Sequence, residues 1–357
     1  MKKTLTIFFL FAFFNIQAVV YDSVEINREL NQPELQTQTQ HYLTRYSTDK
    51  NPNKIIDELI DSDLIPLQKE YILYQLLTEI SQQPPQDYHQ HVVDLMKNYQ
   101  VQARRDADEG PLPVAIFNLS SKAYGIENIW LAYRTEQRFN YLFNKNISQA
   151  VKAIDVAIAE QSRPQWLGIK NSITALSEDQ KNQLADYLSD DVKVNTGLDK
   201  LISHVGLETS DISLINKALD SDQKPIREYT LRKSVQHLPK ATARELLLNA
   251  AQKSQDQKFS ISLLHLFSDD HEVSDFLIEQ LNNKQMADSA AFSLSQSTNI
   301  NLPQRLLQRF YKSSSETEKN HILLALKLNK SRAAQLAIGD VKAKLDNETK
   351  QSQWLKS

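Results

Sequence analysis

The stretch LDSDQKPIREYTLRKSVQHL, residues 219–238, places a short acidic turn before an amphipathic helix and indicates how the rest of the chain is built. The turn centres on Asp222. Pro225 falls in the first turn of the helix expected over 224–238, a position at which a helix tolerates proline. A second amphipathic segment, 211–219, ends at the same turn. Residues 211–238 therefore predict two helices joined by a short polar turn.

The same pattern recurs about every thirty residues from residue 148 onward. Polar turns centre near Arg163, Asp190, Asp222, Ser254, Asn283 and Ser314. The first helices are expected over 148–161, 178–188, 211–219, 243–253, 272–282 and 302–312. The second helices are expected over 164–176, 193–205, 224–238, 256–267, 285–296 and 316–328, with a last, capping helix over 332–345. Capping-box spacings occur at Ser177 and Gln180, Thr242 and Glu245, and Ser315 and Glu318.

The stretch 219–238 resembles the HEAT-like repeat, in which a helix ends in an acidic turn followed by a basic and apolar second helix. LSDDVKVNTGLDKLI, residues 188–202, follows the same outline. Small residues also stand at the packing positions of second helices, at Ala290, Ala291 and Ala325. The resemblance covers about 148–346 and implies an all-α fold, an α-solenoid of antiparallel helix pairs with no β-sheet over that range. It implies no chemistry.

Composition supports an all-helical chain and excludes several classes of enzyme. Only six glycines occur in 357 residues, whereas sheets with tight hairpins need glycine for positive φ angles. The closest two, Gly197 and Gly206, are too far apart for a dinucleotide fingerprint, a P-loop or a nucleophile elbow. The absence of cysteine excludes disulfides, thiolate metal sites and cysteine nucleophiles. With a net charge of −3 and no long basic run, we expect no nucleic-acid partner.

Residues 1–18, MKKTLTIFFLFAFFNIQA, have the pattern of a bacterial export signal. Lys2 and Lys3 precede an apolar core, and Ala18 offers a small residue before the expected cleavage site. The alternative, a membrane anchor, is disfavoured because the apolar run is too short to span a bilayer comfortably. We therefore expect a periplasmic mature protein that begins at Val19. No later segment is apolar enough to cross a membrane.

The remaining regions are predicted from helix and loop signals. The N-terminal region, 19–102, has candidate helices over 33–47, 52–62, 66–82 and 85–99, each with proline at or near its start. Residues 103–112 combine mixed charge with glycine and proline and are interpreted as a linker. Residues 113–147 are expected to form an aromatic helical hairpin with its bend at Tyr124 and Gly125. The predicted solenoid, 148–346, is followed by a polar tail, 347–357.

The stretch DDHEVSDFL, residues 269–277, is one residue short of a zinc-protease motif. A metal could use His271 and Asp275, which share a helix face, but a second histidine is missing. We favour a helix start with Asp269 as N-cap and Glu272 three residues later. Asp87, His91 and Asp94 also align on one helix face, where a solvated surface is favoured over a cation site. We expect no metal and no cofactor.

Three arginines are candidates for contact with a partner. Arg134 and Arg138 alternate with aromatic residues in WLAYRTEQRFNYLFNK, residues 130–145, a mixture that could bind an anionic glycan or a peptide carboxylate. The alternative is a buried aromatic face with the arginines beside it. The third candidate is Arg227, since the resemblance to HEAT-like solenoids implies that second helices line a concave surface.

Together these features predict an exported, non-catalytic α-solenoid scaffold or adaptor that binds a protein or peptide of the cell envelope. The alternative is a peptidoglycan-binding or accessory protein related to the superhelical domains of lytic enzymes. A lytic enzyme needs a glutamate acid in a glycine-containing motif, and none of the glycine-bearing stretches supplies one.

Overall fold

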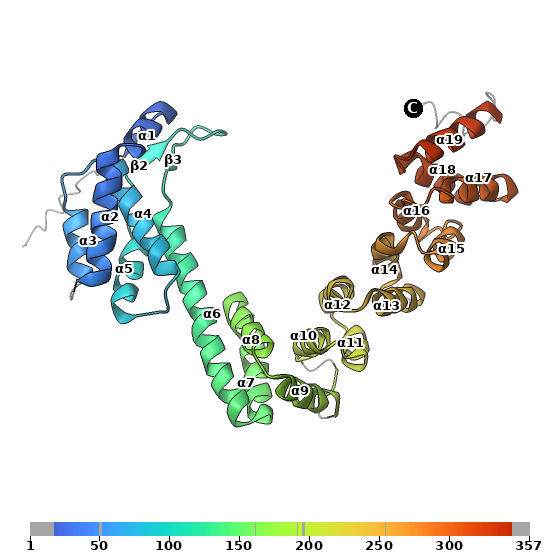
Figure 1. The fold of residues 1–357 in the computed structure, drawn as a ribbon, viewed down its shortest axis with the longest axis horizontal. Coiled ribbons are helices and arrows are strands. Elements are labelled where there is room, and N and C mark those ends of the chain that lie inside the picture. Colours follow the sequence, from blue (N-terminus) through green and yellow to red (C-terminus); the bar gives the residue numbers. More distant parts are fainter. Residues whose placement is uncertain are drawn as a thin grey trace, which may run out of the picture. The chain divides into compact units, whose positions relative to one another are not determined.

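The computed structural model in Figure 1 describes residues 18–344 except 50, 51, 161, 191, 195, 196 and 254. The protein is all-α, as predicted, with only a small sheet in its N-terminal part. None of the described helices is both long and apolar enough to cross a membrane. The predicted signal peptide, apart from Ala18, and the predicted tail 347–357 lie outside the described residues. Contacts divide the chain into two compact units: the described residues of Met1–Tyr141 with Gln161–Ser172, and those of Leu142–Glu160 with Ile173–Ser357.

The first unit is a helical bundle whose core is made by its central helices. Its helices are α1 (Ser23–Leu30), α2 (Pro33–Thr48), α3 (Pro52–Ile60), α4 (Pro66–Ser81), α5 (Asp87–Lys97), α6 (Leu119–Lys145, up to Tyr141) and α8 (Arg163–Thr174, up to Ser172). Proline opens α2 and α4, where its missing N–H has no helical acceptor to lose. Leu76 and Leu77 of α4 are buried among apolar residues of α2, α3, α5 and α6. The four helices predicted over 33–99 are confirmed.

A three-stranded sheet, which the sequence did not predict, lies beside these helices. It comprises β1 (Val19–Val20), β2 (Ala103–Arg105) and β3 (Val114–Ala115), in the order β1-β2-β3. β1 and β2 pair in parallel, with Val19 donating to the carbonyl of Gln102 at 2.8 Å, and β2 and β3 pair antiparallel. The predicted linker 103–112 therefore begins with a paired strand. Strands of two or three residues are too short to give a period-two pattern.

The predicted hairpin over 113–147 is wrong, because α6 runs without a break through Tyr124 and Gly125. Glycine inside a helix costs only about 1 kcal/mol, which packing along the helix can offset. α6 buries one side in its first half, with Ile126 and Trp130, and the opposite side in its second half, with Ala132 and Phe139. Such a change of face within one helix removes the single apolar stripe that a sequence pattern would reveal.

The second unit consists of helices at the predicted thirty-residue period. They are α7 (Ile147–Ala159), α9 (Glu178–Asp190), α10 (Asp199–Thr209), α11 (Ile212–Leu219), α12 (Lys224–His237), α13 (Lys240–Gln252), α14 (Gln257–Leu263), the 3-10 helix η1 (Leu264–Phe267), α15 (His271–Gln280), α16 (Ala287–Ser295), α17 (Leu302–Lys312), α18 (Glu316–Leu328) and α19 (Arg332–Lys344). Their ends agree with the predicted helices to within about three residues, apart from the helix expected over 193–205. That helix begins only at Asp199, after Gly197, whose φ of 84° a right-handed helix does not allow.

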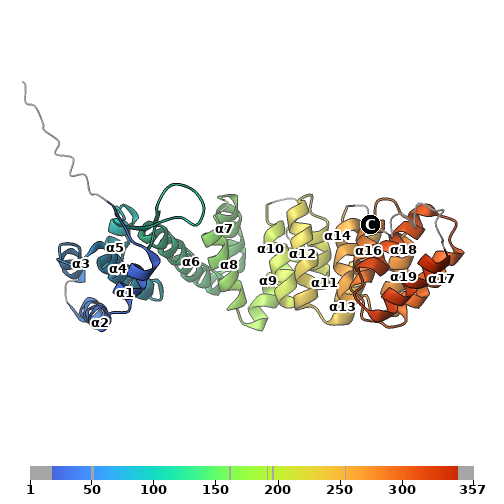
Figure 2. The same ribbon diagram turned by 90° about the horizontal axis from the view of Figure 1, so that it is seen from above.

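Helices of the second unit contact not only their neighbours in sequence but also the helix after next. Among the second helices of the pairs, α10 packs on α12, α12 on α14, α14 on α16 and α16 on α18. Among the first helices, α7 packs on α9, α9 on α11, and α17 on α19. Figure 1 shows the resulting two rows of helices end-on, and in Figure 2 α10 and α12 lie side by side. A continuous apolar core, which includes Leu247, Leu277 and Leu323, lies between the rows.

Polar side chains connect successive pairs of this unit at nearly constant sequence separation. The hydroxyls of Ser203 and Thr230 are 2.7 Å apart, and both residues are buried. Hydrogen bonds across 29 to 32 residues also join Lys217 to the carbonyl of Leu188, Ser293 to the carbonyl of Ile261, and Asn329 to the carbonyl of Ser297. Each of these polar groups thus finds a partner in the adjacent pair, which fixes the register of the packing.

Two of the predicted capping residues, Thr242 and Asp269, do not cap a helix. Ser177 and Gln180 form the expected capping box, and Ser315 caps α18. Thr242, however, lies inside α13, which begins at Lys240 after Pro239. The N-cap of α15 is Asp270 rather than Asp269, since Asp270 accepts from the amides of Glu272 and Val273.

Candidate partner-binding surfaces

The exposed side of α6 carries Arg134 and Arg138, and its aromatic residues divide between core and surface. Phe139 and Trp130 are buried, so the packing interpretation is confirmed for them. Tyr133 and Tyr141 are 39% and 65% exposed. We name Tyr133, Arg134, Arg138 and Tyr141 the α6 patch. Arg134 follows Tyr133 directly, Arg138 lies four residues after Arg134, and Tyr141 lies three residues after Arg138. These spacings place the four side chains on neighbouring rows of the helix surface.

The arginines of the α6 patch have only weak contacts. Arg134 reaches the amide oxygen of Gln90 at 3.5 Å, the limit of a hydrogen bond. Arg138 lies over the ring of Phe139 with its guanidinium carbon 5.5 Å from the ring centre. A guanidinium can bind a carboxylate through two parallel hydrogen bonds, and an exposed tyrosine ring can stack on an apolar group or a sugar face. The patch therefore combines the two kinds of contact predicted for Arg134 and Arg138.

Arg227 does not face a partner, and its prediction as a binding residue is wrong. Its side chain is 7% exposed, and its Nε donates to both carboxylate oxygens of Asp256, at 3.1 and 3.0 Å. Nη1 donates to the carbonyl of Ser221 at 2.7 Å. The hydroxyl of Ser221 in turn donates to the buried Asp199. Arg227 thus belongs to a buried polar chain that crosses three helix pairs, where an unpaired charge would be costly.

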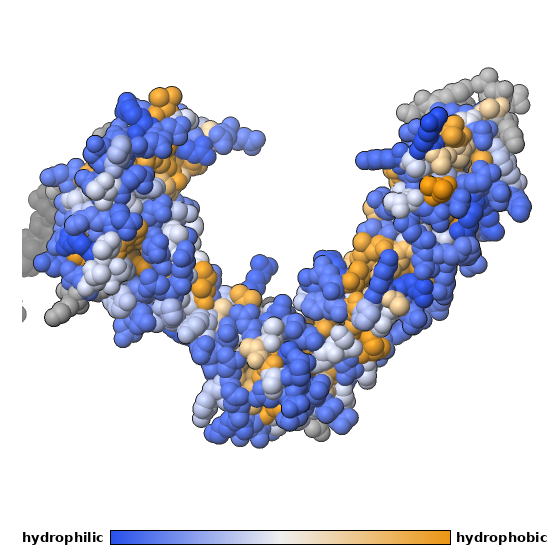
Figure 3. All heavy atoms as spheres, viewed as in Figure 1, coloured by the Kyte–Doolittle hydropathy of each residue, from blue (hydrophilic) through white to orange (hydrophobic). Residues whose placement is uncertain are grey.

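Apolar side chains of the second helices are exposed or only partly buried. We name this surface the second-helix strip, and its members are Tyr229 of α12, Phe259 of α14, Leu266 of η1, Phe292 of α16 and Leu328 of α18. Leu266, Phe292 and Leu328 are each between 45% and 48% exposed, while Tyr229 and Phe259 are partly buried. Figure 3 shows hydrophobic side chains at the surface around α14.

Two members of the strip, Phe259 and Phe292, each contact a side chain of the preceding helix. The guanidinium of Arg232 in α12 lies 5.5 Å from the ring centre of Phe259, and the ring of His265 in η1 lies 6.2 Å from that of Phe292. Sequence reasoning missed this surface, although a signal was present. At 100° per residue, Phe292 lies only 40° around the axis of α16 from the charged Asp288 and on the side opposite to the buried Ala290 and Leu294. The sequence therefore already placed this aromatic residue on the polar side of its helix.

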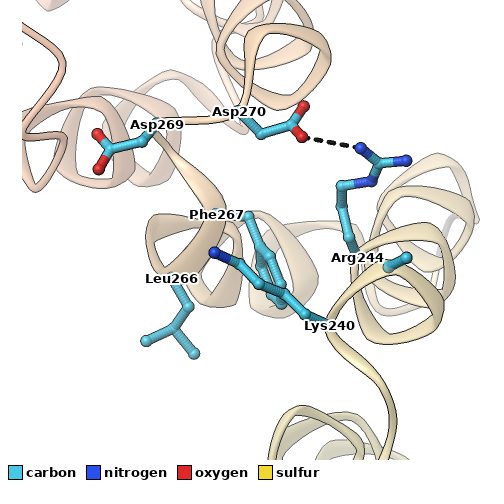
Figure 4. Close-up of a pocket in the computed structure, with 7 residues that line it drawn as sticks. Lys240, Arg244, Leu266, Phe267, Asp269 and Asp270 are labelled. Carbon is cyan, nitrogen blue, oxygen red and sulfur yellow. Dashed lines mark hydrogen bonds and ion pairs between the residues drawn. The ribbon is translucent and has the colours of Figure 1, made fainter.

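A pocket of about 520 Å³ lies beside the loop that joins η1 to α15 (Figure 4). Lys240 and Arg244 of α13 form one wall, and Leu266 and Phe267 form another. Arg244 is already paired with Asp270 at 2.8 Å and lies 3.6 Å from Glu272. The charge of this arginine is therefore largely compensated within the chain.

Three of the candidate metal ligands, His271, Asp275 and Asp94, already contact other side chains. His271 Nδ1 lies 2.7 Å from Asp275, which is also paired with Arg305. On α5, Asp94 accepts from Lys97 at 2.8 Å and from Gln90 at 3.1 Å. Over the described part of the chain no group of three or more histidine, aspartate or glutamate side chains has the arrangement to hold a metal ion.

Glu70 of α4 is a buried acid that sequence reasoning did not identify. It is fully buried, and its Oε1 accepts from the amides of Gln102 and Ala103 at 2.6 and 3.2 Å. Its Oε2 has no hydrogen-bond partner among the described residues. Burial raises the pKa of Glu70 to about 7, although the two amides and the charge of Arg104 favour the ionised form. Glu70 therefore couples α4 to the start of β2 through a group that titrates near neutral pH.

Comparisons of the chain with protein-family models, with curated proteins and with solved structures give no match. The HEAT-like resemblance of 188–202 and 219–238 therefore stays a prediction from the sequence pattern.

Proposed function

We propose that this protein is an exported, non-catalytic α-solenoid that acts in the periplasm as a scaffold or adaptor for a protein or peptide of the cell envelope. The solenoid interpretation is supported by the thirty-residue period and by the packing of each second helix from α10 to α18 on the next second helix. Export is supported by the pattern of residues 1–18.

The second-helix strip is the observation that carries the binding function. Leu266, Phe292 and Leu328 are exposed there on successive helices, whereas the apolar residues between the two helix rows are buried. Contiguous exposed apolar residues beside polar ones are typical of interaction surfaces rather than of free solvent-facing helices. In a stack of helix pairs such a row offers a long binding surface without requiring a pocket.

The α6 patch favours a second candidate function, binding to peptidoglycan. Tyr133 and Tyr141 expose rings that can stack on sugar faces, and Arg134 and Arg138 can bind the carboxylates of the peptide stems. The two candidate functions use different surfaces of the chain, so that substitutions can separate them.

The test is affinity capture from periplasmic extract, together with sedimentation on purified peptidoglycan. The mature protein, expected to begin at Val19 by N-terminal sequencing, should capture a protein partner. Replacement of Phe292 by aspartate should abolish that capture, while R134A with R138A should not. Sedimentation on peptidoglycan that is lost only in the double arginine variant would favour the second function. Turnover of peptidoglycan, or an intact Met1 on the cellular protein, would contradict the proposal.

A further inference from the structure

The spacing of the second-helix strip limits the shape of what can lie on it. Packed helices have axes about 8–10 Å apart. Phe259 and Leu266, Phe292 and Leu328 belong to three successive packed elements of the strip, which are α14 with η1, α16 and α18. A polyproline II chain rises about 3.1 Å per residue and completes a turn in three residues, which is about 9.3 Å. A chain in this conformation presents a side chain to the same side at every third residue, once for each helix of the strip.

One end of the strip is basic. Arg232, Lys233 and Lys258 lie on α12 and α14, and none of them has a carboxylate within 4 Å among the described residues. Glu228, the one acid within α12, pairs with Lys224 at 3.6 Å, and α14 carries no acid. The uncompensated charge at this end is therefore positive.

The basic end of the strip adjoins its apolar part, because Arg232 contacts Phe259. Arg232 covers the ring of Phe259, so a carboxylate bound to the guanidinium would stand beside an aromatic ring. Toward α16 and α18 the strip is apolar, with Phe292 and Leu328 at its surface. A polypeptide that fits this order needs acidic residues at one end and apolar residues after them.

We propose that the second-helix strip binds an extended acidic peptide segment that carries an apolar side chain at every third residue, with its acidic end on α12 and α14. The apolar side chains contact Phe259 and Leu266, Phe292 and Leu328 in turn, while the acids bind Arg232 and Lys258. This inference rests on the proposed adaptor function and specifies the chemistry of the partner.

The test measures fluorescence anisotropy with the mature protein and two labelled synthetic probes. One probe is Asp-Glu-Asp-Phe-Ser-Pro-Leu-Ser-Pro-Leu, and the other has the same residues in reverse order, so that both directions of the bound chain are tested. The comparison peptides replace the acids with lysine or scramble the apolar positions. One acidic probe is expected to bind, with an affinity that falls as salt is raised, because the contact with Arg232 is screened.

Variants of exposed residues locate the binding without disturbing the core. Phe292→Ala and Arg232→Glu should each weaken binding by about tenfold or more, as expected for anchor residues. Two matched controls should leave it unchanged: Leu336→Ala, which removes a 63% exposed leucine of α19, and Lys312→Glu, which reverses an exposed charge at the end of α17.

Binding that fails for both acidic probes, that is as tight for the lysine peptide, or that falls equally in the controls would overturn the proposal. Self-association that Phe292→Ala abolishes would also overturn it, because the occupant would then be a second copy of the chain. If the wild-type protein and Phe292→Ala capture the same partner from extract equally well, the adaptor function stands and only the assignment to the strip fails.

Discussion

The carboxylate of Asp269 accepts two hydrogen bonds from Thr298, one from the backbone amide at 2.7 Å and one from the hydroxyl at 2.6 Å. It also accepts from the hydroxyl of Ser297 at 2.6 Å and from the amide of Asn299 at 3.0 Å. Burial alone would raise the pKa of Asp269, but these bonds hold it below its usual value. Asp269 thus joins the loop before α15 to the loop before α17, instead of capping a helix.

This role predicts that Asp269→Ala is more destabilising than Asp270→Ala. Loss of four hydrogen bonds to a charged group should cost about 2 kcal/mol or more, whereas loss of the N-cap at Asp270 should cost about 1 kcal/mol. Urea unfolding of the two variants measures the difference. An equal or larger effect of Asp270→Ala would show that the connection between the loops contributes little.

Zinc should not raise the melting temperature of the wild-type protein. A ligand that binds only the folded state stabilises it, but His271 and Asp275 are engaged with each other and with Arg305. Melting curves with and without zinc, for the wild type and for His271→Ala, provide the check. A zinc-dependent rise that disappears in His271→Ala would restore the metal interpretation of residues 269–277.

Gly168→Ala and Gly125→Ala should change the free energy of unfolding in opposite directions. A Cβ on Gly168 of α8 would meet Cβ of Thr135 at 2.7 Å and the amide nitrogen of Glu136 at 2.9 Å on α6, closer than real contacts allow. Gly168→Ala should therefore destabilise the protein by about 1–3 kcal/mol.

A Cβ on Gly125 of α6 would meet nothing within 4 Å, so that Gly125→Ala is the matched control. It should stabilise the protein by up to about 1 kcal/mol, because alanine favours a helix over glycine. Thermal melts measure both effects. Destabilisation by Gly125→Ala would contradict the continuous helix and favour a bend at this position.

Glu70 should make stability decrease as the pH rises. Its pKa of about 7 in the folded protein lies above its ordinary value of 4.5, so the folded state holds the proton more tightly. The stabilisation is fully present below about pH 4.5 and is lost as the pH rises to about 7. The loss should be about 2 kcal/mol, after allowance for solvent near the site.

Glu70→Gln keeps an acceptor for the amides of Gln102 and Ala103 but cannot ionise. It should be more stable than the wild type at pH 8, and its stability should vary less between pH 5 and 7.5. Glu34→Gln, at an exposed position of α2, is the control. Denaturant unfolding across this range decides the point: an unchanged pH dependence in Glu70→Gln would mean that Glu70 ionises normally.

The buried pair of Arg227 and Asp256 should be sensitive to the loss of one partner. Arg227→Ala leaves the carboxylate of Asp256 buried without its counterion and should cost about 3–5 kcal/mol. Arg138→Ala, on the exposed side of α6, should change stability by less than about 0.5 kcal/mol. The double variant R227M/D256L should recover most of the loss, since an apolar pair carries no desolvation cost. Failure of the double variant to recover would indicate that the contact of Arg227 with Ser221 matters more than the charge.

Sequence alone determined the helical class and the positions of most helices. Amphipathic periodicity, proline at helix starts and capping residues act over a few neighbouring positions, so that they can be read from a single chain. The helices over 302–312 and 316–328 agree with their predicted bounds for this reason. The thirty-residue period also follows from the sequence, because it needs only the recurrence of local signals.

Tertiary structure decided which side of each helix is covered. Arg227 stands on a second helix as expected, but a carboxylate 29 residues away draws it into the core. Pairing of Val19 with Ala103, and the change of buried face along α6, likewise depend on segments far apart in the chain. The burial of a residue depends on the segments that pack against it in the folded chain. Because those segments lie thirty or eighty positions away, the local sequence around the residue does not predict which of them it will contact.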